Sequence, residues 1–168
     1  MLKRLFEEFD EDTIKLFVQK NSDYYISKWK LMAAKNSMIS WNWATFFFTG
    51  LWFGYRKMIF YGFLYVLISV LFSLPIIGFF LWIAVWISVG MFGNYIYGKY
   101  TYEKLKELKL LYPIEKDFKT AVIEKGGTSI IDIILIILLS FFIYAIMIKI
   151  SLMLIGTPEW DYGGGVWG

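Results

Sequence analysis

The segment SWNWATFFFTGLWFGYRKM, residues Ser40–Met58, decides how the chain is organised. Eight of the fifteen residues from Trp41 to Tyr55 are aromatic, and no charged residue occurs between Lys35 and Arg56. Fourteen helical residues reach only about 21 Å at about 1.5 Å each. The hydrocarbon core of a bilayer is roughly 30 Å thick, and an apolar segment this short is more often re-entrant or interfacial than spanning.

The distribution of positive charge favours the same interpretation. Residues 1–40 contain seven lysines and arginines, and residues 99–128 contain seven lysines. A crossing helix at residues 41–54 would put these two polar segments on opposite sides of the membrane, against the positive-inside rule. If the helix enters and returns, both segments lie in the cytoplasm. We therefore predict a short re-entrant or interfacial helix over residues 41–54, and the sequence does not decide between these two forms.

Two long uncharged runs predict transmembrane helices. The first run, Met58–Gly98, has 41 residues with Pro75 near its middle, and the second, Ile133–Ile148, has 16. Proline disrupts a helix interior, and 41 residues exceed the roughly 20 that one crossing needs. The first run is therefore predicted to form a hairpin with its tip at Leu74–Ile77. A soluble protein with buried core helices is the alternative. The predicted spans are residues 57–73, 76–97 and 129–155.

The amino-terminal segment, residues 1–40, is predicted to form short amphipathic helices. Asp12 and Thr13 offer one helix start, and Ser22 or Asp23 offers a second. Aromatic residues interleaved with lysines suit a membrane surface. A solvated bundle packed on itself is the alternative.

The polar segment at residues 99–128 is predicted to contain two more short helices. Leucines recur in its first half and apolar residues at spacing four in its second, so both helices would lie on the membrane or on each other. Ser129 and Asp132 then form a capping-box pattern that opens the third span.

Composition excludes several classes of chemistry. The 168 residues include no cysteine and no histidine, so disulfides, thiol chemistry, histidine bases and histidine-ligated zinc are excluded. The predicted spans carry no ionisable residue near their midplane, where coupled transporters usually place one. No phosphate-binding glycine motif follows a strand. We predict no enzymatic activity, no cofactor, no metal site and no nucleic-acid partner.

A face of small residues marks the second span. Gly90, Asn94 and Gly98 recur every fourth residue, and Gly93 stands in the adjacent row. Small residues let helix backbones approach closely, and an asparagine can form a hydrogen bond across the contact. This helix-packing face is either an interface with a partner or a contact within the chain, against residues 41–54 or the third span. The sequence favours the second.

Several residues around the aromatic segment are predicted to anchor it at the lipid headgroups. Tryptophan and tyrosine favour the membrane interface, and basic side chains reach toward lipid phosphates. The predicted anchors are Trp41, Trp43, Trp52, Tyr55, Arg56 and Lys57.

Four segments resemble the bacterial family of domain of unknown function 2628. They are FVQKNSDYYISKW, SWNWATFFFTGLWFGYRKM, GMFGNYIYGKY and EKGGTS, which together run from about Phe17 to Ser129. The order and spacing of the aromatic block are the most specific part. The resemblance implies a small bacterial membrane protein with no assigned activity. Some family members carry a cysteine-rich metal-binding segment, which this cysteine-free chain does not have.

Together these features predict an all-α integral membrane protein. It has three transmembrane helices, the short aromatic helix, amphipathic cytoplasmic helices and a flexible tail at residues 156–168. Its predicted location is the bacterial inner membrane, with the amino terminus in the cytoplasm and the carboxyl terminus outside. Beyond the lipid bilayer, we expect a membrane-protein partner or a homo-oligomer. The predicted function is that of an assembly, adaptor or regulatory subunit, and the alternative is a component of an oligomeric transporter or channel.

Overall fold

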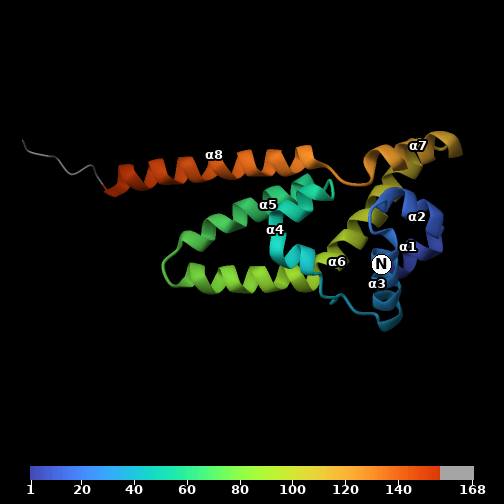
Figure 1. Cartoon of the computed structure of the whole chain (residues 1–168), viewed down its shortest axis with the longest axis horizontal. Coiled ribbons are helices and arrows are strands. Elements are labelled where there is room, and N and C mark those ends of the chain that lie inside the picture. Colours follow the sequence, from blue (N-terminus) through green and yellow to red (C-terminus); the bar gives the residue numbers. More distant parts are fainter. Residues whose placement is uncertain (156–168) are drawn as a thin grey trace, which may run out of the picture.

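The computed structural model describes residues 1–155, which form helices and no strand (Figure 1). The prediction of an all-helical chain is confirmed for these residues. The tail at residues 156–168 lies outside them. The helices are α1 (Leu2–Glu8), α2 (Glu11–Val18), α3 (Ser22–Lys35), α4 (Trp43–Tyr55), α5 (Ile59–Ser69), the short 3₁₀ helix η1 (Val70–Ser73), α6 (Ile77–Leu111), α7 (Glu115–Lys125) and α8 (Ile130–Ile155).

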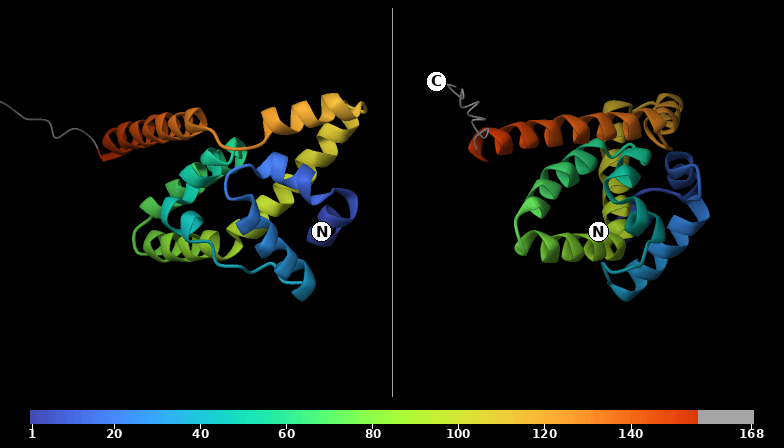
Figure 2. Two further views of the ribbon diagram at one scale, coloured as in Figure 1. Left: turned by 45° about the vertical axis from the view of Figure 1, so that its right-hand side comes forward. Right: turned by 60° about the vertical axis from the view of Figure 1, so that its left-hand side comes forward.

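One half of the molecule is a compact bundle, which we call the head. It contains α1, α2, α3, α7 and the carboxyl-terminal part of α6 (Figure 2). Its core is apolar and includes Leu5, Phe17, Trp29, Leu105 and Val122, each at most 1% exposed. The helices of the head therefore pack on one another and on α6 around an apolar core.

The other half is an apolar group of helices formed by α4, α5, η1, the first part of α6, and α8 (Figure 1). The arms of the α5–α6 hairpin diverge from their tip, and α4 lies between them while also contacting α8. Both α6 and α8 are long and apolar enough to cross a membrane. The first arm, Ile59–Ser73, is a shorter apolar helix.

The long helix α6 corrects the predicted boundary at residue 98. We expected a span at residues 76–97 and a separate helix after it, but α6 continues without interruption from Ile77 to Leu111. The sequence changes from apolar to charged within α6, but the helix does not end at that point. Leu105 and Leu108 are buried in the head core, whereas Leu111 at the end of the helix is 62% exposed.

Two helix starts in the head also differ from expectation. Asp10, and not Asp12 or Thr13, caps α2, because its side chain accepts a hydrogen bond from the Thr13 amide at 2.6 Å. The residue before α3 is Asn21, which has a left-handed conformation with φ of 63° and no side-chain cap. Neither residue was predicted as a cap.

One of the two hydrogen bonds of the predicted capping box is present at the start of α8. The Asp132 amide donates to the Ser129 hydroxyl at 3.1 Å. The Ser129 amide, however, donates to the Tyr55 carbonyl at 2.9 Å, where the capping box would have used the Asp132 carboxylate. A backbone hydrogen bond thus joins the start of α8 to the end of α4.

Candidate functional site

The small-residue face of α6 is filled by the chain's own residues. A Cβ added at Gly90 would lie 3.1 Å from Phe46, and one at Gly93 would lie 2.6 Å from the Thr45 methyl group. The amides of Ser40 and Asn42 donate to the carbonyls of Met91 and Gly90, each at 2.9 Å. The main chain before α4 thus runs directly along α6, which it could not do past larger side chains.

Asn94 lies at the centre of this contact and is fully buried. Its side-chain oxygen accepts from Asn42 Nδ2 at 2.9 Å, and its own Nδ2 donates to Ser40 Oγ at 3.1 Å. Asn42 in turn caps α4, because its Oδ1 accepts from the Thr45 amide at 3.1 Å. Two buried amides therefore hold the start of α4 against α6.

Gly98 contacts a different element from the other small residues. A Cβ there would lie 2.6 Å from Leu2 of α1 and 2.8 Å from the Trp29 indole nitrogen of α3. The same indole donates to the Asn94 carbonyl at 2.7 Å. The small-residue face is thus divided between α4 and the head, which leaves no open strip on it for a partner.

Arg56, one of the predicted anchors, lies in the protein interior, where backbone carbonyls accept its hydrogen bonds. Its side chain is 2% exposed and donates from Nη1 to the Val18 carbonyl at 3.2 Å and from Nη2 to the Lys20 carbonyl at 3.0 Å. The guanidinium carbon lies 4.6 Å from the Tyr25 ring centroid and 5.1 Å from that of Tyr97. Carbonyl dipoles and aromatic faces replace the water that a buried cation loses.

The other predicted anchors fall into two groups. Trp52 is 3% exposed and packs against Tyr25 and Tyr97 in the core, so it is no headgroup anchor. Trp43 is 63% exposed. Trp41, Tyr55 and Lys57 are partly exposed, and the Lys57 ammonium donates to the Glu124 carbonyl at 2.8 Å.

The aromatic helix α4 is broken at its middle. Thr49 has φ of 43° and ψ of −118°, which separates helical residues 43–48 from helical residues 50–55. A positive φ is strained for a β-branched residue. Ile136 of α8 packs against Gly54 of α4 and Gly62 of α5. Cβ atoms added at these two glycines would collide with its side chain.

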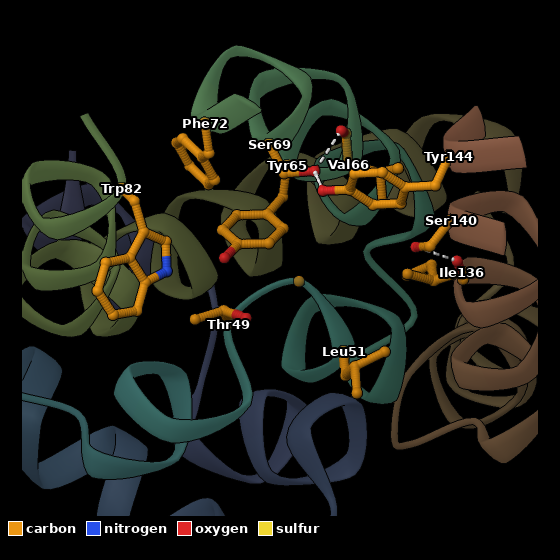
Figure 3. Close-up of a pocket in the computed structure, with 11 residues that line it drawn as sticks. Thr49, Leu51, Tyr65, Val66, Ser69, Phe72, Trp82, Ile136, Ser140 and Tyr144 are labelled. Atoms are coloured by element: carbon orange, nitrogen blue, oxygen red, sulfur yellow. Dashed lines mark hydrogen bonds between the residues drawn. The ribbon is translucent and has the colours of Figure 1, made fainter. Parts of the chain in front are cut away.

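A cavity of about 260 Å³, which we call the hydroxyl cavity, lies at this break between α4, α5, α6 and α8 (Figure 3). Its apolar walls include Phe72, Trp82 and Ile136. Non-helical backbone within an apolar layer is tolerated where it is buried in protein or lines a cavity. The polar residues that line the cavity are Thr49, Tyr65, Ser69, Ser140 and Tyr144.

The hydroxyl groups of this cavity differ in their partners. Ser69 Oγ lies 2.9 Å from the Tyr144 hydroxyl and donates to the Val66 carbonyl, and Ser140 donates to the Ile136 carbonyl (Figure 3). Tyr65 points its hydroxyl into the space between Thr49 and Trp82. Among the described residues, no charged side chain lines the cavity. Its hydroxyl groups can exchange hydrogen bonds with a small neutral molecule.

The described residues contain no cluster of acidic side chains that could hold a metal ion. Comparisons with protein-family models, with curated proteins and with solved structures find no match to this chain. The resemblance to domain of unknown function 2628 therefore stays a prediction. Sequence reasoning singled out Gly90, Gly93 and Asn94 but missed Ser40 as a partner of Asn94, and it missed the hydroxyl cavity.

Asn94→Leu tests the polar contact between α4 and α6. The change removes the acceptor of the Asn42 amide, and a buried polar group without a partner costs about 1–3 kcal/mol. We expect Gly93→Leu to lower stability further because its side chain collides with Thr45. The free energy of unfolding is measured in mixed detergent micelles, with Ser88→Leu on the exposed face of α6 as control. Equal stability of Asn94→Leu and Ser88→Leu would contradict this account.

Proposed function

We propose that the protein is a membrane-anchored assembly or adaptor subunit, in which the apolar half sits in the bilayer and the head binds a partner protein. The observation that carries this proposal is an exposed apolar turn between α6 and α7, which we call the distal turn. Leu110 is 81% exposed, Leu111 62% and Ile114 64%. The distal turn lies at the end of the molecule opposite the hairpin tip (Figure 1).

Such a patch is unusual on the polar half of a protein. Apolar side chains that meet on a surface and lie far from lipid mark contact sites for other proteins. Helix α6 connects this patch directly with the apolar half, so a partner bound there is held at a fixed place relative to the membrane. The described residues of the packed head contain no cluster of acidic side chains that could hold a metal ion.

The proposed orientation follows from charge. The lysines of residues 1–40 and 99–128 all belong to the head side, and the positive-inside rule puts that side in the cytoplasm. In a bacterial inner membrane, α5 and α6 would form a hairpin that returns to the cytoplasm, α4 a re-entrant wedge, and α8 the final crossing. The carboxyl-terminal tail, outside the described residues, would then lie on the outer side.

Replacement of the distal turn tests the adaptor function. We expect Leu110→Glu with Leu111→Glu to abolish a stoichiometric complex with a second copy or with one partner protein. Both side chains are exposed, so the fold should keep its stability within about 0.5 kcal/mol. Complex mass is measured by native mass spectrometry after gentle solubilisation. Ile123→Glu, an exposed site on α7, is the control. A wild-type protein that is only monomeric and unpartnered would refute the proposal.

Single cysteines test the orientation in this cysteine-free chain. An impermeant thiol reagent on intact cells should leave Ser22→Cys and Thr120→Cys unlabelled and should label Gly164→Cys. After permeabilisation, all three sites should react. External labelling of either head site would show that the orientation is inverted.

The hydroxyl cavity favours a second candidate function, a component of an oligomeric transporter or channel. Discontinuous helices that line a polar site near the bilayer midplane are a common device of transporters. Because the cavity is uncharged, its solute would be neutral and able to form hydrogen bonds.

Glycerol flux into proteoliposomes tests this second candidate. Stopped-flow light scattering should show entry several-fold faster than into protein-free liposomes. Tyr65→Phe should slow entry because it removes the hydroxyl that points into the cavity. Tyr112→Phe, outside the cavity, is the control. Glycerol entry at the rate of protein-free liposomes would contradict the proposal of a transporter for small neutral solutes.

A further inference from the structure

A second cavity, of about 430 Å³, lies where α3, α4 and α8 meet, and we call it the junction cavity. Its walls are mostly apolar and include Ala44, Phe48 and Leu51 of α4 and Ile133 of α8. It is separate from the hydroxyl cavity at the break of α4, although Leu51 borders both. The junction cavity lies between the head and the apolar half of the molecule.

One end of the junction cavity is polar, where Arg56, Tyr55 and Asn21 line it. The Arg56 guanidinium has carbonyl and aromatic partners, but its Nε has none. The ion pairs of the described chain join other residues, so no carboxylate lies within ion-pair distance of Arg56. Within the part of the chain that the structure describes, the positive charge is thus buried without a counter-charge.

A buried cation without an anion is costly, and carbonyls and aromatic rings offset only part of that cost. In surroundings of low dielectric constant its field is weakly screened, so it acts on the adjoining cavity. A second cation stands nearby, because the Lys20 ammonium lies 5.7 Å from the centroid of the Tyr55 ring. Of the residues that the structure describes, no acidic one lines the junction cavity. Its polar end therefore favours an anion.

In the membrane placement proposed above, the polar end of the junction cavity would lie nearer the membrane surface than its apolar walls. Arg56 directly follows α4 and lies three residues before α5, at the level where the apolar helices begin. Ile133 lies one turn inside α8. The cavity thus runs from a cationic end at the polar boundary to apolar walls within the apolar layer. An anionic lipid has the same order of charged head and acyl chain, and a free phosphate ion would leave the apolar walls uncovered.

We propose that the junction cavity binds an anionic phospholipid, with its phosphate near Arg56 and Lys20 and an acyl chain against Ala44, Leu51 and Ile133. The lipid would supply the counter-charge that Arg56 does not find among residues 1–155. It would also link α3 of the head to α4 and α8. This site rests on the proposed membrane placement of the apolar half but not on the adaptor or transporter role, because it involves neither the distal turn nor the hydroxyl cavity.

The test uses the full chain in mild detergent. Palmitoyl-oleoyl phosphatidylglycerol, the phosphatidylcholine with the same chains, or inorganic phosphate is added in turn. Thermal unfolding reports stabilisation, and native mass spectrometry reports retained lipid. We expect phosphatidylglycerol to raise the unfolding midpoint and stay bound, with little effect of the other two. Equal effects of both lipids, or the full effect from inorganic phosphate, would overturn the proposal.

Two matched pairs of variants locate the site. Ala44→Phe fills the junction cavity and should abolish the preference for phosphatidylglycerol, whereas Ala145→Phe on the exposed face of α8 should keep it. Lys20→Gln should weaken binding about fivefold, the factor for one lysine near an anionic lipid surface. Lys28→Gln removes a lysine that likewise lies 5.7 Å from a tyrosine ring, but that ring belongs to Tyr24, which does not line this cavity, so the change should have no effect.

If Ala44→Phe lowers stability, the comparison of Lys20→Gln with Lys28→Gln still tests the site. Lys20 is exposed, and only its backbone carbonyl holds Arg56, so Lys20→Gln leaves the fold unchanged. Wild-type lipid preference in both Ala44→Phe and Lys20→Gln would place the lipid elsewhere and overturn the proposal.

Discussion

The close approach of two backbones at Gly90 and Gly93 is the contact on which the structure depends. Because these positions carry no side chain, the main chain leading into α4 can form hydrogen bonds with α6 carbonyls. Asn94 and Asn42 then fix the first turn of α4 in a site closed to water. Since α4 separates the hairpin arms and also contacts α8, the arrangement of the whole apolar half follows from this one contact.

The break at Thr49 extends the reach of α4. A straight helix of thirteen residues would present one continuous surface, whereas the two pieces direct their side chains differently. The first piece packs on α6, and the second presents Gly54 to α8 and carries Trp52 into the head core. The strained backbone is compatible with a stable fold because the surrounding helices over-determine it. One short segment thus connects three helices of the apolar half with the head.

Much of the fold could be predicted because its signals are local. The lengths of the uncharged runs and the position of Pro75 indicated the hairpin tip and the location of α8. The surroundings of Arg56 could not be predicted in this way. An arginine after an aromatic segment gives the same sequence pattern whether its side chain binds lipid phosphates or backbone carbonyls. One of its partners is the carbonyl of Val18, 38 positions away. Every residue has a carbonyl, so the type of residue at position 18 does not mark it as a partner. The hydroxyl cavity likewise needs Ser69 and Tyr144, which are 75 positions apart.

The uninterrupted course of α6 has a mechanical consequence. Its 35 residues make a rod about 52 Å long at about 1.5 Å per residue, with one end in the hairpin and the other at the distal turn. Helices adapt to bilayers of different thickness by tilting. A tilt of about 10° around Gly93 displaces Leu111, some 27 Å further along the rod, by about 5 Å. Because α6 is continuous, a tilt of its apolar part would move the head at its other end.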